Sequence, residues 1–164
     1  MNNSIIVKSI VDENFQDYKK ASMFISFPKC DFKCFRDLGL PPSNCQNFNI
    51  INMKNIEVEI SSVFQRYIKN HITESIVLGG LEPFLSFDEV YNLISYFRLN
   101  DCNDDFVIYS GYYPDEIENQ VDNLKNFKNI IIKFGRYIPD SIPKYDEILG
   151  VTLASDNQFS VKIS

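Results

Sequence analysis

The sequence predicts an α/β fold built on a parallel sheet, and the prediction rests on three buried runs and the segments between them. Residues 75–78, 106–109 and 130–132 are short apolar runs that end near glycine or a polar turn, as buried strands do. Two segments with helix signals separate these runs. A strand, helix, strand order joins neighbouring parallel strands through right-handed crossovers, so we expect helices packed on a parallel sheet.

The first part of the chain adds two strands and one helix. Residues 5–11 and 22–27 have the aliphatic content of strands, and the polar residues 12–20 between them predict a loop. Further on, apolar side chains recur at three- and four-residue spacing, which predicts one buried face of an amphipathic helix. This face consists of Ile56, Ile60, Val63, Phe64, Tyr67 and Ile68.

Start signals precede the other two helices. Ser86 lies three residues before Glu89, the spacing of a capping box, and Pro114 followed by two acidic residues is typical of a first helical turn. Residues 134–164 are less regular, and no repeat or linker divides the chain, so we expect a single domain over residues 1–164. The helix that follows Ser86 is expected to bury Val90, Leu93, Ile94 and Phe97.

Composition excludes several classes of function. The 164 residues have a formal net charge of −6, which disfavours a nucleic-acid interface, because such an interface needs a basic face. No apolar run approaches the length of a membrane span, and the first residues lack the basic and apolar regions of a secretory signal. We therefore expect a cytoplasmic protein that binds neither nucleic acid nor membrane.

A cluster of cysteines organises the rest of the sequence. Cys30, Cys34 and Cys45 lie in one loop directly after a predicted strand. In a reducing cytosol, three clustered thiols favour metal ligation over disulfide formation. A structural zinc ion takes four protein ligands, whereas a cubane iron–sulfur cluster held by three cysteines leaves one iron open. The missing fourth ligand favours the cluster.

The alternative is a zinc site with a distant fourth ligand, Cys102 or His71. Outside such a site, Cys102 is expected to be a loop or partly buried thiol. His71 is expected to be structural, because a basic group suits the C-terminus of a helix. Arg136 in a later loop could pair with a carboxylate of a ligand or a partner, but a lone arginine in a loop is more often a solvated charge, which is what we expect.

Three loops are expected to meet at one rim of the sheet. The cysteine loop, the loop at Gly79 and Gly80, and the loop at Ser110 each follow a predicted strand. Ligands of parallel sheets bind at the carboxyl ends of the strands. A glycine pair alone is ordinarily a tight turn, but a position after a strand and before Glu82 favours ligand contact.

These segments together resemble the radical S-adenosylmethionine (SAM) enzymes and, among them, the small activating proteins of anaerobic, glycyl-radical ribonucleotide reductase. The resemblance covers most of the chain, and the segments occur in the same order. They are Cys30-Asp-Phe-Lys-Cys34 with Cys45-Gln46-Asn47, Gly79-Gly80-Leu81-Glu82-Pro83, Tyr109-Ser110-Gly111-Tyr112, Gly135-Arg136-Tyr137 and Ser155-Asp156-Asn157-Gln158.

The resemblance implies a fold, two cofactors and their binding residues. The fold would be a partial, TIM-like (β/α) barrel of the radical SAM type with a parallel sheet. The cofactors would be a 4Fe-4S cluster, held by Cys30, Cys34 and Cys45, and SAM on the remaining iron. No catalytic residue is implied beyond the cluster. The implied SAM-binding residues are Gly79, Gly80, Glu82, Ser110 and Asn157.

The sequence departs from the family pattern in two places. Residues 35–44 separate Cys34 from Cys45, where the family has two residues, and Leu81 is inserted before Glu82. Lengthening a closed loop this much costs under about 1–2 kcal/mol, so the three sulfurs can still converge. We expect the longer loop to project beside the cluster and contact the partner protein, and Glu82 to reach SAM through a bulged turn.

The implied function is reductive cleavage of SAM to install a glycyl radical on a partner, an anaerobic ribonucleotide reductase. A low-potential donor such as flavodoxin or ferredoxin would supply the electron. Two alternatives remain open. One is a radical SAM enzyme that acts on another peptide, protein or metabolite. The other is a non-enzymatic iron–sulfur carrier or electron-transfer module, whose cluster spectrum would ignore added SAM.

Overall fold

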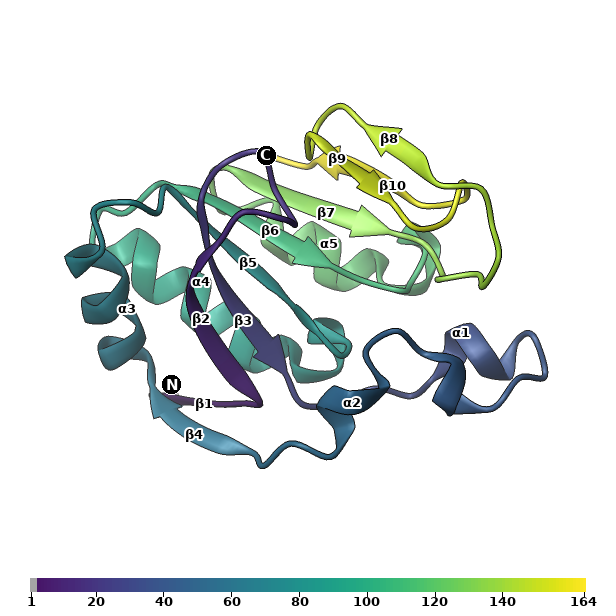
Figure 1. Cartoon of the computed structure of the whole chain (residues 1–164). Coiled ribbons are helices and arrows are strands. Elements are labelled where there is room, and N and C mark those ends of the chain that lie inside the picture. The colour runs from purple at the N-terminus through teal and green to yellow at the C-terminus, as the bar shows by residue number, and fades with distance from the viewer. Residues whose placement is uncertain (1–2) are drawn as a thin grey trace.

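A computed structural model describes residues 3–164, which are organised around a six-stranded mixed sheet (Figure 1). The strand order is β10-β7-β6-β5-β3-β2. The four central strands β3, β5, β6 and β7 pair in parallel, and β2 and β10 add antiparallel edges. The strands are β2 Ser9–Asn14, β3 Ser22–Phe27, β5 Ser75–Gly80, β6 Asp105–Tyr109, β7 Ile130–Phe134 and β10 Phe159–Lys162.

Three helices, α3 Ile60–Lys69, α4 Phe87–Leu99 and α5 Glu118–Leu124, connect these strands and pack on one face of the sheet (Figure 1). Alternate strand residues point to this face because side chains alternate along a strand. The predicted buried positions of α4 lie in this core, as do most of those of α3. The strand side chains in this core include Met23, Ile25, Ile76, Leu78, Phe106, Ile108, Ile130 and Ile132.

The opposite face of the sheet has a smaller core. Val77, Val107 and Ile131 point to it and pack against Tyr18, Leu149 and Leu153. Phe24 and Tyr109 extend this layer toward the carboxyl ends of the strands. The segment before β3 and the C-terminal part of the chain therefore cover the face that the helices leave open.

The remaining elements lie around the main sheet. Strand β1 Ser4–Val7 pairs with β4 Ile56–Glu59, and β8 Lys144–Asp146 pairs with β9 Val151–Leu153, both antiparallel. The cysteine segment between β3 and β4 contains three short helical turns and extends away from the sheet (Figure 1). These turns are α1 Lys33–Arg36, η1 Pro42–Asn44 and α2 Phe48–Ile51, and η2 Pro83–Ser86 and η3 Pro114–Glu116 follow later strands.

Several element boundaries differ from those that the sequence predicts. The run 5–11 is split into β1 and β2 at Lys8, whose buried ammonium group donates to the carbonyl oxygens of Ile51 and Met53 at 3.0 and 2.6 Å. The helix predicted from Ile56 begins only at Ile60, because residues 56–59 pair with β1 instead. The predicted loop 12–20 is also shorter, since β2 continues to Asn14.

The capping box predicted at Ser86 is wrong, although the helix begins where it indicates. Ser86 is the N-cap residue of α4, but its side chain makes no capping hydrogen bond. Glu89 instead accepts a hydrogen bond from the backbone N–H of Ile6 at 2.7 Å. A tertiary contact to β1 therefore replaces the local pairing that the spacing favours.

Within the described residues, no helix is long and apolar enough to cross a membrane. The main sheet is open, with β2 and β10 as its two edges. Strand order does not define how strongly a sheet curves, so the partial barrel stays a prediction.

Candidate functional site

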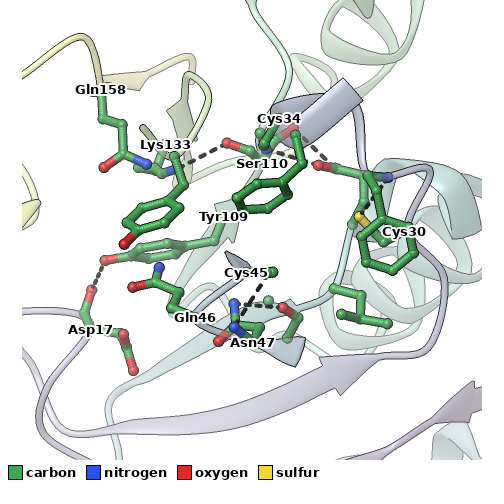
Figure 2. Close-up of a pocket in the computed structure, with 18 of the residues that line it drawn as sticks. Asp17, Cys30, Cys34, Cys45, Gln46, Asn47, Tyr109, Ser110, Lys133 and Gln158 are labelled. Atoms are coloured by element: carbon green, nitrogen blue, oxygen red, sulfur yellow. Dashed lines mark hydrogen bonds between the residues drawn. The ribbon is translucent and has the colours of Figure 1, made fainter. Parts of the chain in front are cut away.

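The three clustered cysteines line one cavity of about 290 Å³ at the carboxyl ends of the parallel strands (Figure 2). Cys30 follows β3, Cys34 lies in α1, and Cys45 follows η1. All three thiols are free and only partly buried. Gly79, Gly80, Glu82 and Ser110 line the same cavity, so the structure brings together seven of the eight residues singled out for cluster and cofactor.

Backbone N–H groups lie near each of these sulfur atoms. Phe32 donates to Cys30 Sγ at 3.3 Å and Asn47 donates to Cys45 Sγ at 3.4 Å, and the backbone N–H of Tyr137 acts to lower the pKa of the Cys34 thiol. Burial nevertheless raises the pKa of all three thiols, that of Cys30 to about 12. A metal that binds here must therefore displace protons, and the N–H donors then stabilise the thiolates that result.

The donor set fits an iron–sulfur cluster better than a single metal ion. In the described part of the chain, no three His, Cys, Asp or Glu side chains are close enough to hold one metal ion. A four-iron cube instead binds its cysteines at separate corners, so the sulfurs surround a cavity. Cys102 and His71 precede the amino ends of β6 and β5, at the opposite end of the sheet, so neither completes a zinc site. Cys102 lies in a loop, as predicted, and is buried there.

Gly79 and Gly80 are the last residues of β5 and not part of a loop as expected, and the loop that follows them is joined to both ends of the cysteine segment. The N–H of Leu81 donates to Phe27 O at 3.2 Å, and the N–H of Glu82 donates to Lys29 O at 2.7 Å. From the other end, the side-chain amide of Asn47 donates to Gly80 O at 2.9 Å. The inserted Leu81 is thus accommodated while the loop stays beside the cysteines.

Glu82 is a buried carboxyl group, with a side chain that is almost entirely inside the protein. It accepts hydrogen bonds from the N–H groups of Phe84 and Gly111 at 3.1 and 2.8 Å, and from Ser110 Oγ at 2.9 Å. Only 6% of the residue is exposed, and burial raises its pKa to about 7. Glu82 therefore links the loops after β5 and β6, which are far apart in the sequence.

Lys133 is a cavity residue that sequence reasoning missed. It lies on β7, is 6% exposed, and donates from Nζ to the carbonyl oxygens of Ser110 and Gly135 at 3.0 and 3.2 Å. Burial lowers its pKa to about 8, and the nearby Glu82 opposes that change. The sequence offered one sign of this role, a single lysine within the apolar run 130–134. That sign indicates a cavity residue only when the position of β7 beside the cysteine loop is known.

Gly111 explains how Cys34 fits beside the β6 loop. A Cβ atom at position 111 would lie 3.1 Å from Cys34 Sγ and 3.7 Å from Glu82 Oε2. Such a contact is tighter than ordinary packing, so the missing side chain makes room for the sulfur. Sequence reasoning placed Gly111 in the correct loop but did not assign it this role.

Asn157 and Arg136, two residues that the sequence analysis considered, do not line the cavity. Asn157 donates from Nδ2 to Tyr113 Oη and Arg136 O at 2.9 and 3.0 Å. Its neighbour Gln158 lines the cavity, so Asn157 lies next to it. Arg136 is not the solvated charge that we expected. It is 8% exposed and forms ion pairs with Glu116 and Asp37.

Comparison with known proteins places this site in a family context. A family model described as a 4Fe-4S single cluster domain matches residues 20–153, which include all three cavity cysteines. A search of curated proteins gave no match.

Proposed function

We propose that this chain, which belongs to the family of 4Fe-4S single cluster domains, is a radical SAM enzyme. The chemistry that the cluster supplies with SAM bound is reductive cleavage into methionine and a 5′-deoxyadenosyl radical. The supporting observation is that three thiols, a buried carboxyl group and a buried amine line one cavity.

The three cysteines would hold the cluster. Cys30, Cys34 and Cys45 provide one thiolate each and leave one iron without a protein ligand, which is open to the amino and carboxylate groups of SAM. The N–H groups directed at the sulfurs would spread the negative charge of the thiolates and help to set the reduction potential.

Glu82 and Lys133 offer an acceptor and a donor to the amino and carboxylate groups of an amino-acid head group. Glu82 Oε2 accepts one hydrogen bond, from Gly111, and a carboxylate oxygen can accept a second one from an N–H of the SAM amino group. Lys133 Nζ donates two hydrogen bonds to carbonyl oxygens, which leaves one N–H for a carboxylate. We assign the methionine half of SAM to the space between them.

The other implied residues would contact SAM at closer range or from the side. Gly79 and Gly80 line the cavity and would contact a ligand through their backbone groups, since a Cβ atom at either position would meet a side chain of β3. Ser110 donates a hydrogen bond to Glu82, and this contact holds the loop after β6 beside the cavity. Asn157 would act from the second layer, where its Oδ1 is buried without a partner among the described residues.

The proposed substrate is a glycine of a large partner, an anaerobic ribonucleotide reductase, with a flavodoxin- or ferredoxin-like electron donor. The support is the projecting cysteine segment (Figure 1), in which Leu38 and Leu40 are exposed. Such a surface suits contact with another protein better than enclosure of a small substrate.

The test is anaerobic reconstitution with iron and sulfide, reduction with dithionite, and assay of SAM cleavage to 5′-deoxyadenosine and methionine. Wild-type protein and Cys102→Ala should cleave SAM, whereas Cys34→Ala should not. A complete cluster that leaves SAM intact would favour the carrier function instead. Mixing the active protein with a reductase should then give a glycyl-radical EPR signal. Cleavage without that signal would point to another substrate.

A further inference from the structure

Glu116 joins the cysteine loop to the body of the protein. Its carboxylate accepts hydrogen bonds from both terminal nitrogens of Arg136, at 2.5 and 2.7 Å, and from the N–H of Tyr113 at 2.8 Å. Lys33, the residue directly before Cys34, also donates to this carboxylate. One side chain at the end of η3 therefore connects the loop after β7 to the cysteine loop.

Arg136 makes a second connection to the same loop. Its Nε donates to Asp37 at 3.1 Å, and Nη1 donates to Gly111 O at 2.8 Å. Its guanidinium group lies over the ring of Tyr113, with 5.0 Å between the charge centre and the ring centroid. These contacts fix the planar group on all sides, which is the geometry in which bidentate arginine–carboxylate pairs are strong.

The charges of this network are stable across the pH range in which the protein would work. Hydrogen bonds from Arg136 and Lys33 hold the pKa of Glu116 far below its usual range, and Glu116 in turn raises the pKa of Arg136. Both partners therefore remain ionised near neutral pH.

Few other contacts hold this part of the loop. Phe35 is the buried residue of α1, and its ring lies 6.2 Å from that of Tyr137. Tyr112 Oη donates to Asp31 at 2.8 Å. The polar links reach residues 31, 33 and 37, on both sides of Cys34, so together with the buried Phe35 they hold the backbone around that sulfur.

We propose that Glu116, acting through Arg136 and Lys33, is a positioning residue that holds the segment from Cys30 to Cys34 in place before the cluster binds. Glu116 does not line the cavity and touches none of the cysteines. The proposal rests on the assignment of these cysteines to an iron–sulfur cluster, and it does not depend on the chemistry of SAM.

The first test measures how accessible each thiol is in the full-length, metal-free protein. Iodoacetamide labelling under anaerobic conditions, followed by mass spectrometry, gives a separate rate for each cysteine. Glu116→Gln should raise the rates at Cys30 and Cys34 about tenfold, since it removes charged hydrogen bonds. Buried Cys102 at the opposite end of the sheet reports global opening, and its rate should not change.

Two further variants separate release of the loop from other effects. Glu118→Gln makes the same charge change two residues on, at an exposed position, and should label like the wild type. Lys33→Met removes a positive charge, so a through-space effect on the thiol pKa would be opposite in sign to that of Glu116→Gln. Release of the loop instead predicts faster labelling in both variants. Opposite changes, no change, or an equal rise at Cys102 would overturn the proposal.

The second test measures the rate at which iron and sulfide are incorporated. Glu116→Gln should load about tenfold more slowly than the wild type or Glu118→Gln, because the loop must first be ordered. Equal loading rates would contradict the proposal. A wild-type protein that acquires no cluster would refute the iron–sulfur assignment itself, and the labelling result separates that failure from failure of the loop contact.

Discussion

The stability of the fold should depend on the protonation of Glu82, because its carboxyl group is buried in the cavity lining. Burial raises its pKa to about 7 in the folded protein, from 4.5 for the exposed group of an unfolded chain. Between these values the folded state binds the additional proton, so the free energy of unfolding should fall as pH rises. The stabilising contribution is complete below pH 4.5 and lost as pH rises through 7.

Glu82→Gln should remove most of this pH dependence, since an amide does not titrate. Urea unfolding of the metal-free protein at pH 5 and pH 7 measures the effect. From pH 5 to pH 7, the free energy of unfolding should fall by at most about 3 kcal/mol more in the wild type than in the variant. A variant with the same slope as the wild type would show that another group is responsible.

Gly111→Ala should weaken cluster binding without unfolding the protein. The added Cβ would lie 3.1 Å from Cys34 Sγ, so the sulfur must move by a few tenths of an ångström. We expect a lower iron content after reconstitution and a thermal midpoint within about 2 °C of the wild type, which corresponds to a change in the free energy of unfolding of at most about 1 kcal/mol. Full iron content in this variant would mean that Cys34 has more freedom than the packing indicates.

Local patterns identified some of these residues and missed others for a physical reason. The three cysteines, the glycine pair and Glu82 stand in short motifs, and the structure places all of them at one cavity. Lys133 and Glu116 have no such motif, because their roles depend on partners in other elements. Arg136 was misinterpreted for the same reason, since its ion pairs span distant parts of the chain.

The end of strand β5 requires a glycine where the chain turns into the loop beside the cavity. Its last residue, Gly80, has φ +81°, and a Cβ atom there would lie 2.7 Å from Ser26 Cβ on the neighbouring strand. The left-handed backbone and the close approach of β3 both require glycine.

Gly80→Ala should therefore destabilise the protein by about 2–4 kcal/mol, from backbone strain together with overpacking. Gly39→Ala is a matched control, since Gly39 has φ +65° but nothing within 4 Å of its Cβ position. That variant should lose only about 1–2 kcal/mol. Equal losses in denaturant unfolding would show that packing against Ser26 contributes nothing.

Element positions were easier to predict than element limits. Residues 22–27 form β3 as predicted, and the periodic apolar positions of α3 and α4 are mostly buried, because burial itself imposes the spacing. The predicted start of α3 at Ile56 was wrong because pairing of β4 with β1 is a long-range contact. The capping box predicted at Ser86 was wrong for the same reason, because Glu89 accepts a hydrogen bond from β1 instead.

The molecule as a whole places its candidate cluster ligands at one end of the sheet and Cys102 at the other. Single alanine variants at Cys30, Cys34 and Cys45 should each lose most of the bound iron after reconstitution, because a cluster with two protein ligands is poorly held. Cys102→Ala should bind as much iron as the wild type. Iron retained in all three loop variants would contradict the assignment of ligands.

The helices pack on one face of the sheet, and the cavity opens at its carboxyl end beside the projecting cysteine segment (Figure 1). The alternation of strands and helices predicted that three segments meet at one rim of the sheet, and residues of all three line the cavity. The covering of the second face could not be predicted, because it comes from the irregular segments around Tyr18 and Leu149.

EPR spectroscopy of the reduced, reconstituted protein with and without SAM tests the central claim most directly. The account predicts a 4Fe-4S signal that changes shape when SAM is added, because one iron has no protein ligand and SAM binds to it. A cluster signal that is identical with and without saturating SAM would contradict the account.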